Sequence, residues 1–209
     1  MVGLEFKQFT CLRGGNALFE PLSFKVGAGE LVQIAGPNGA GKTTFLRSIC
    51  GLFGEWEGAM AWDGEIVSAP SYDMKLKLLY LGHHPGVQKS LTARENLEWF
   101  FGVKGLPFPG QIEEALGRVG LRGYEDVSCH EMSAGQLRRV ALARLYVSGA
   151  ALWVLDEPFT AIDKQGVTQL EQRLSEHCKV GGSVILTTHQ PLKSGNVRLV
   201  ELQAAGSKS

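Results

Sequence analysis

The chain has 209 residues, 44% of them hydrophobic, and its 21 basic and 21 acidic residues give a formal net charge of zero. This composition predicts one compact domain with a true core, and the balanced charge argues against a nucleic-acid partner, which leaves a basic footprint. Four scattered cysteines without paired C-x-x-C spacing indicate reduced thiols in a cytosolic protein. No run approaches ~18 consecutive apolar residues, so we expect a protein that reaches a membrane only by docking.

Short apolar runs predict the strands. The first covers residues 4–9 and begins without a basic and apolar signal segment before it. Further strands are expected over 31–35, 78–81, 152–155, 184–187 and 197–202, and residues 59–62 and 66–67 predict a hairpin around Asp63-Gly64.

Helices are expected over residues 44–50, directly after Thr92, and over 111–119. Thr92 and Glu95 have the spacing of a capping box that opens the second of these helices. Residues 106–110, with two prolines, are expected to break the chain before the third. The small-residue tail 204–209 is expected to be mobile.

Continuous apolar strands that alternate with helices predict an α/β fold with a mainly parallel sheet. Between about residues 73 and 147 the pattern becomes helical, which predicts a subdomain inserted into that fold. We therefore expect a single domain over 1–209, in which 1–72 and 148–209 form the core and 73–147 form the insertion.

A glycine-rich segment between the strand 31–35 and the helix 44–50 has the composition of a phosphate-binding loop. Glycines allow a tight turn whose N–H groups point inward, and the helix start adds its positive end. Lys42 is expected to reach the terminal phosphates, and Thr43 to place its hydroxyl on Mg²⁺. The sequence therefore predicts that a nucleoside triphosphate binds at Gly36, Pro37, Asn38, Gly39, Ala40, Gly41, Lys42, Thr43 and Thr44.

Two carboxylates follow the apolar run 152–155 directly. Asp156 is expected at the carboxyl end of a buried strand, where open α/β sheets bind ligands. Its oxygens suit Mg²⁺, a hard cation, and Glu157 is then placed to act as the general base toward the attacking water.

A third segment, Met132-Ser133-Ala134-Gly135-Gln136 with a helix-like run after it, resembles the signature motif of ABC-transporter ATPases. The family pattern is Leu-Ser-Gly-Gly-Gln, so Met132 and Ala134 depart from it mildly. The resemblance implies a P-loop NTPase (RecA-like) core with an antiparallel β subdomain and a helical subdomain. It also implies that Ser133, Gly135 and Gln136 meet the γ-phosphate of ATP bound by a second copy, so that two copies form a dimer.

Further segments resemble the family in order. Residues 160–163 are similar to its D-loop, and His189 is similar to the switch histidine that hydrogen-bonds the γ-phosphate and takes part in catalysis with Glu157 and Lys42.

Two positions depart from the family. Where an aromatic residue usually stacks on adenine, the spacing places Arg13, whose planar guanidinium can also stack on a π-face, and Phe19 is the alternative. At the Q-loop glutamine, which senses Mg²⁺ and the membrane subunit, the spacing places His83.

The adjacent pair His83-His84 also permits a haem or metal ligand role. We favour substitution of the Q-loop glutamine, because neighbouring residues of an extended chain point to opposite sides.

The short cassette, residues 82–86 and residues 91–97 resemble the ATP-binding subunits of the cytochrome c maturation system. That resemblance implies a peripheral ATPase on the cytoplasmic side of the bacterial inner membrane. Its partners would be integral membrane subunits of a haem export complex. The alternatives are the ATPase of a different small-substrate exporter, a soluble ABC ATPase without a transport role, or a small P-loop kinase, for which the signature segment has no use.

Overall fold

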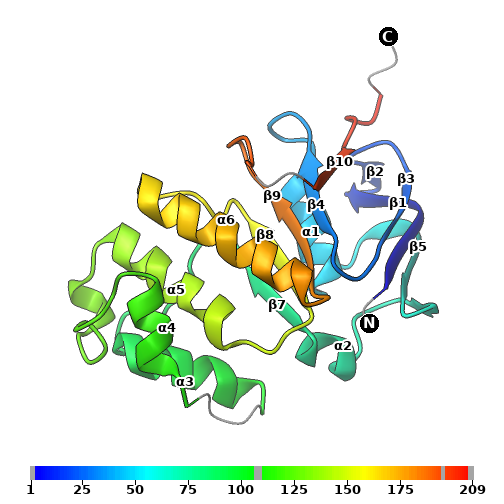
Figure 1. The fold of residues 1–209 in the computed structure, drawn as a ribbon. Helices are drawn as coiled ribbons and strands as arrows, with labels where there is room; N and C mark the ends of the chain where they lie inside the picture. The colour runs from blue at the N-terminus through cyan, green and yellow to red at the C-terminus, as the bar shows by residue number, and fades with distance from the viewer. Residues whose placement is uncertain (1–2, 106–109, 194–195, 207–209) are drawn as a thin grey trace.

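A parallel sheet forms the centre of the molecule (Figure 1). The structure is a computed structural model that describes residues 3–105, 110–193 and 196–206. The strand order is β10-β4-β9-β8-β7, and all four pairings are parallel. The strands are β4 (Leu31–Ala35), β7 (Leu78–Leu81), β8 (Leu152–Asp156), β9 (Ser183–Thr187) and β10 (Val197–Glu201). The predicted parallel α/β sheet is confirmed, with strand ends within one residue of those expected.

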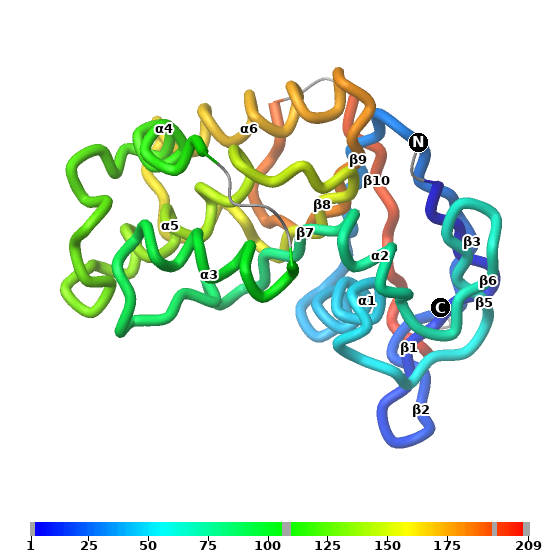
Figure 2. Tube along the Cα trace, turned by 90° about the horizontal axis from the view of Figure 1, so that it is seen from below, coloured from blue at the N-terminus to red at the C-terminus, as the bar shows by residue number. Residues whose placement is uncertain are grey.

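Helices cover both faces of this sheet, which explains its continuous apolar strands. Along β8, Trp153 and Leu155 belong to the core beneath α6, whereas Leu152 and Val154 belong to the core beneath α1. Figures 1 and 2 show α1 (Lys42–Ile49) and α6 (Lys164–Lys179) on opposite faces of the sheet.

A second, antiparallel sheet packs beyond α1. It contains β1 (Leu4–Arg13), β2 (Asn16–Ala17), β3 (Leu22–Val26), β5 (Trp56–Trp62) and β6 (Glu65–Val67). The predicted hairpin is confirmed as β5–β6. The strand predicted over 4–9 is too short, because β1 passes through a bulge at Gln8 (φ 47°) and continues to Arg13. Phe45 of α1 joins the two layers, with ring centroids 5.0 Å from Phe6 and 5.9 Å from Phe9.

The remaining helices gather at the end of the molecule opposite the antiparallel sheet (Figure 2). They are α3 (Ala93–Val103), α4 (Ile112–Arg118) and α5 (Ala134–Val147), whereas α2 (Tyr72–Leu76) lies near α1. The predicted capping box is confirmed, since Glu95 N donates to Thr92 Oγ1 over 3.1 Å and Thr92 N donates to Glu95 Oε2 over 2.8 Å. The expected break at 106–110 lies outside the described residues, except for Gly110.

The tail begins in an ordered bridge, which corrects part of the expected mobility. Ala204 pairs with Phe19 in an isolated antiparallel bridge. Residues 207–209 lie outside the described residues. Within the three described ranges, no helix has both the length and the apolar character needed to cross a bilayer.

Candidate functional site

The glycine-rich segment forms a tight loop between β4 and α1. Gly36 has φ 142°, and a Cβ there would lie 2.7 Å from the carbonyl oxygen of Leu202, so the loop leaves no room for a side chain. The Lys42 ammonium lies across this loop and donates to the carbonyl oxygens of Gly36 (2.8 Å) and Pro37 (3.0 Å). The first turn of α1 carries no acidic residue, so nothing on the helix neutralises its positive end. The loop therefore collects a cation and backbone dipoles, the elements of an anion site.

Asp156 lies where the sequence placed it, at the end of β8 and beside the loop. Its side chain is buried, and each carboxylate oxygen accepts one hydroxyl: Oδ2 from Thr43 (2.8 Å) and Oδ1 from Thr187 (2.7 Å). Thr43 and Asp156 are 113 residues apart in the chain and meet because β4 and β8 end at the same edge of the sheet. Two hard oxygen ligands are thereby brought together.

Glu157 adopts a backbone conformation that non-glycine residues rarely use, with φ 49°. Its N–H donates to the Thr187 carbonyl oxygen (3.2 Å) and to Thr187 Oγ1 (3.1 Å). Its Oε1 lies 3.4 Å from Nε2 of His189. The predicted general base and the predicted switch histidine are therefore neighbours.

These groups share one cleft of about 310 Å³. Its lining is formed by Arg13, Asn38, Gly39, Gly41, Lys42, Thr43, Thr44, His83, Asp156, Glu157 and His189. Of the loop residues predicted to bind the nucleotide, Gly36, Pro37 and Ala40 are not part of this lining, and Ala40 is buried in the core.

The two unusual positions, Arg13 and His83, both reach the cleft. The alternative in which Phe19 stacks on adenine is wrong, because Phe19 is fully buried and packs edge-on against Phe45. The orientation argument for His83 and His84 is also wrong. The chain bends at this pair instead of running extended, and the two rings lie 5.6 Å apart at 74°. Among the described residues, no cluster of three or more His, Cys, Asp and Glu side chains is placed to hold a metal.

The predicted signature segment opens α5 and lies outside the cleft. Ser133 caps the helix: Gln136 N donates to Ser133 Oγ (3.2 Å), and Ser133 N donates to Gln136 Oε1 (2.9 Å). Ser133, Gly135 and Gln136 do not line the cleft that holds Lys42 and Glu157. The cleft and the start of α5 therefore lie at separate places on the chain.

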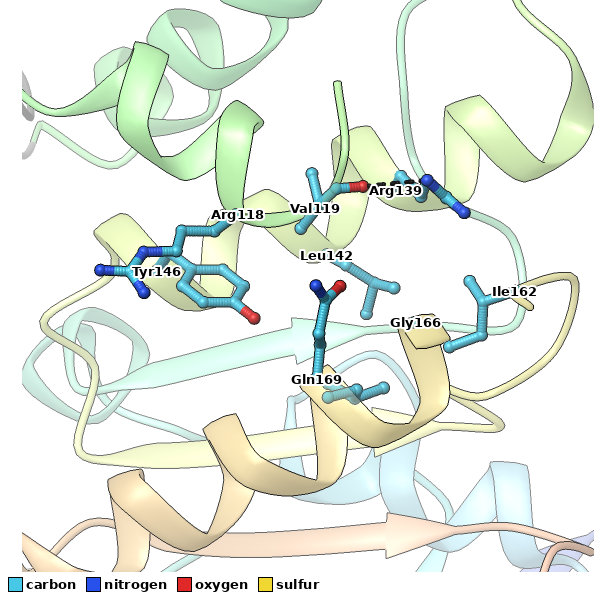
Figure 3. Close-up of a pocket in the computed structure, with 9 residues that line it drawn as sticks. Arg118, Val119, Arg139, Leu142, Tyr146, Ile162, Gly166 and Gln169 are labelled. Atoms are coloured by element: carbon cyan, nitrogen blue, oxygen red, sulfur yellow. Dashed lines mark hydrogen bonds between the residues drawn. The ribbon is translucent and has the colours of Figure 1, made fainter. Parts of the chain in front are cut away.

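Arg139 of α5 connects this helix to residues 160–163, the segment similar to the D-loop. Its guanidinium donates to Asp163 Oδ2 (2.7 Å) and to the Val119 carbonyl oxygen (3.3 Å), the bond drawn in Figure 3. A hydrogen bond from the Gly166 N–H, reinforced by Arg139, lowers the pKa of Asp163, which caps α6. The pocket in Figure 3 lies between the end of α4, α5 and the start of α6. Its volume is only about 20 Å³, which leaves room for about one water molecule.

Sequence reasoning missed Thr187 and assigned no role to Arg138, although both hold the site together. Thr187 is fully buried and binds Asp156 and Glu157 with one hydroxyl. Its only signal in the sequence is a hydroxyl at the end of an apolar strand, and the strand order that places it beside Asp156 is not visible there.

Comparisons with known proteins identify the family of this chain. A family model described as ABC transporter matches residues 19–160. The chain is 48% identical over 207 residues to the cytochrome c biogenesis ATP-binding export protein CcmA of Saccharophagus degradans, covering 94% of this chain and 91% of that protein. It is 51% identical over 189 residues to the protein of the same name from Aliivibrio fischeri, covering 90% and 93%.

Among solved structures, a dimeric ATP-binding cassette in a post-hydrolysis state with ADP and Pi matches with a TM-score of 0.82 at 25% identity, covering 97% of this chain and 94% of that one. The fold expected from the motif resemblance, an ABC ATPase cassette, is confirmed. Because the family model spans most of the chain and the relatives are about half identical along nearly all of it, this chain belongs to the ATP-binding subunits of ABC transporters, in the CcmA group.

Proposed function

We propose that this chain is the ATP-hydrolysing subunit of an inner-membrane export complex that serves the biogenesis of c-type cytochromes. The observation that carries the proposal is the cleft that brings Lys42, Asp156, Glu157 and His189 together while leaving Ser133 outside it. The name shared by the relatives supplies the biological setting.

In this proposal the phosphate loop binds the triphosphate of ATP. Lys42 leaves the carbonyl oxygens of Gly36 and Pro37 and offsets charge on the β- and γ-phosphates. Asn38, Gly39, Gly41 and Thr44 line the cleft beside it. Arg13 takes the adenine ring, over which a planar guanidinium can stack.

The residues present fit a magnesium ion. Thr43 Oγ1 and Asp156 Oδ2 lie 2.8 Å apart in the cleft, and hydroxyl and carboxylate oxygens are the ligands that Mg²⁺ accepts. When bound, Mg²⁺ would neutralise charge on the phosphate oxygens. His83 lines the same cleft and would lie near the ion, but Thr43 and Asp156 would hold it, because an imidazole nitrogen is a poor direct ligand for a hard cation.

Glu157 orients the water that attacks the γ-phosphorus and accepts its proton as the bond to ADP breaks. His189, whose Nε2 lies 3.4 Å from Glu157 Oε1, donates a hydrogen bond to the γ-phosphate. These two groups, together with Lys42, form the proposed catalytic set.

Two copies are needed for a complete site. Ser133, Gly135 and Gln136 lie outside their own chain's cleft, and the helix N-terminus beside them suits a phosphate. We propose that they close on the ATP held by a second copy, as in a dimer with two composite sites. The matched cassette structure is itself dimeric.

The partners are integral membrane subunits of the haem export complex, reached from the cytoplasmic side, and the inserted subdomain 73–147 makes the contact. Within it, Trp99 is 43% exposed, whereas Phe101 on the same helix is buried, so Trp99 is an aromatic residue of α3 that is available for docking. Haem as the cargo rests on the resemblance to the cytochrome c maturation system; the ATPase of a different small-substrate exporter is the alternative.

The substitution Glu157→Gln tests the site. We expect it to lower ATP turnover about 100-fold or more while ATP affinity stays unchanged. It should also yield an ATP-dependent dimer, detected by light scattering, that is absent with ADP. Turnover close to that of the unmodified protein would refute the general-base role. Co-purification with a sugar or peptide permease instead of haem-handling membrane subunits would refute the proposed complex.

A further inference from the structure

Arg138 is a buried cation beside the cleft residues Asp156 and Glu157. It lies in α5, five residues after the helix cap Ser133, and is only 3% exposed. Its guanidinium donates to three carbonyl oxygens: Gly82 (2.8 Å), Glu157 (2.7 Å) and Asp156 (3.3 Å). Burial lowers the pKa of Arg138, and the nearby carboxylates of Asp156 and Glu157 oppose that effect.

Two of these carbonyls belong to residues that line the cleft, and the third belongs to the residue before His83. Glu157 has the left-handed φ of 49°, a conformation that persists only when its surroundings impose it. The Glu157 carbonyl is held by Arg138 and its N–H by Thr187, so both sides of the residue are fixed. Gly82 directly precedes His83, which lines the same cleft.

The same helix carries the surface that faces the second copy. Ser133 and Gln136 form the cap at its first turn, and Arg138 follows within the next turn. A rigid helix connects these two places, because one turn spans only about 5 Å. A shift of the capped end is therefore passed to the guanidinium and from there to the backbone of Glu157.

We propose that Arg138 is a positioning residue that links the signature end of α5 to Glu157 and to the loop bearing His83. Docking of this chain's signature segment on the ATP of a second copy sets the placement of this chain's own Glu157. Hydrolysis at one site thereby depends on closure at the other. The inference rests on the proposed role of Glu157.

Arg144 provides a matched control on the same helix. It is 4% exposed and also donates to two carbonyl oxygens, those of Pro85 (3.3 Å) and Gly86 (2.7 Å). Its guanidinium lies 4.7 Å from the centre of the Phe100 ring. Its hydrogen bonds hold the loop after His83 and do not reach Glu157, so its removal reports the cost of losing a buried arginine that leaves the backbone of Glu157 in place.

The experiment compares full-length Arg138→Met, Arg138→Lys and Arg144→Met, each with and without Glu157→Gln. We expect Arg138→Met to lower kcat about 100-fold, the effect of misplacing a catalytic group, with ATP affinity within about threefold of the unmodified protein. Arg144→Met should lower Tm as much and kcat no more than about threefold. Arg138→Lys should recover part of kcat, because its ammonium still reaches a carbonyl.

The double variant decides how Arg138 acts. In the Glu157→Gln background, Arg138→Met should cause no further loss of residual turnover, because two changes that remove one function do not add. An equal further loss, or equal kcat for the Arg138→Met and Arg144→Met variants, would overturn the inference. Should Arg138→Met not fold, Arg138→Lys carries the same comparison, and a kcat equal to that of the unmodified protein overturns it. Near-normal turnover of Glu157→Gln alone would instead refute the proposed function.

Discussion

Replacing Thr187 with valine tests how the cleft holds its carboxylates. Thr187 is fully buried at the end of β9, and its hydroxyl has two partners. It donates to Asp156 Oδ1 over 2.7 Å and accepts from Glu157 N over 3.1 Å. Valine keeps the branched shape but removes both bonds.

The expected cost follows from these two contacts. A hydrogen bond to a charged group contributes about 1.5–3 kcal/mol, whereas Glu157 N retains the Thr187 carbonyl oxygen at 3.2 Å and loses little. We therefore expect the free energy of unfolding to fall by about 2 kcal/mol. A domain stable by about 5–15 kcal/mol still folds after that loss.

The functional effect should appear in the magnesium dependence. Asp156 keeps only its bond from Thr43, so its carboxylate gains rotational freedom. We expect the Mg²⁺ concentration for half-maximal ATP turnover to rise about tenfold, equivalent to 1.4 kcal/mol.

The control is Thr10→Val, which removes a buried hydroxyl that donates to the neutral Phe19 carbonyl, far from the carboxylates. Urea unfolding measures stability, and turnover is titrated against Mg²⁺. The reasoning is refuted if both variants lose the same stability and both keep the unmodified Mg²⁺ dependence.

Three further predictions concern other parts of the chain. Gly58→Ala should lower the free energy of unfolding, measured with urea, by more than about 3 kcal/mol. The reason is that Gly58 has φ 84° and that a Cβ would lie 2.0 Å from a carbonyl oxygen of β1. Gly54→Ala is the control and should cost little, because a Cβ there meets nothing within 4 Å. Burial, with a contribution from a neighbouring arginine, lowers the pKa of His177 to about 4. The contribution of neutral His177 to stability is therefore complete above pH ~6.5. It falls by up to about 1.4 kcal/mol per pH unit as the pH drops toward 4. His177→Phe, which keeps the parallel stack on Trp153, should remove that slope between pH 7.5 and 5, and a persisting slope assigns it elsewhere. Arg13→Ala should weaken ATP and ADP equally, by about 2- to 10-fold in a fluorescence titration, and unchanged affinity would show that Arg13 makes no base contact.

Local patterns in the sequence were sufficient for the strands of the parallel sheet and for the phosphate loop. The strands β4 and β8 could be predicted from their own residues, because a strand that is buried on both faces is a continuous apolar run. The capping box at Thr92 is equally local, since both of its hydrogen bonds join residues three positions apart. These elements place Lys42 and Asp156 at one edge of the sheet.

Contacts between distant segments explain what sequence reasoning missed. β3 has only five residues and exposes alternate positions, so its apolar signal is weak, and it pairs with β1 across a bulge. Phe19 is suitable for stacking on adenine in sequence, but the bridge to Ala204 and the Phe45 ring bury it. A bend after β7 brings His83 and His84 together, where an extended chain separates them.

The site also combines residues from local motifs with residues from distant segments, and this combination affects how the site works. The groups proposed to meet ATP lie in local motifs. Thr187 and Arg138, which bind the backbone of Glu157 in its left-handed conformation, come from a strand end and a helix whose contacts are visible only in the fold. Arg138 lies 19 residues from Glu157 and 56 from Gly82 in the chain, so its hydrogen bonds join distant segments at the place where we propose that closure acts on Glu157. A general base held only by its neighbours in sequence would be indifferent to the signature helix. A base held by a guanidinium on that helix must respond to it, which is the property that two mutually dependent sites require.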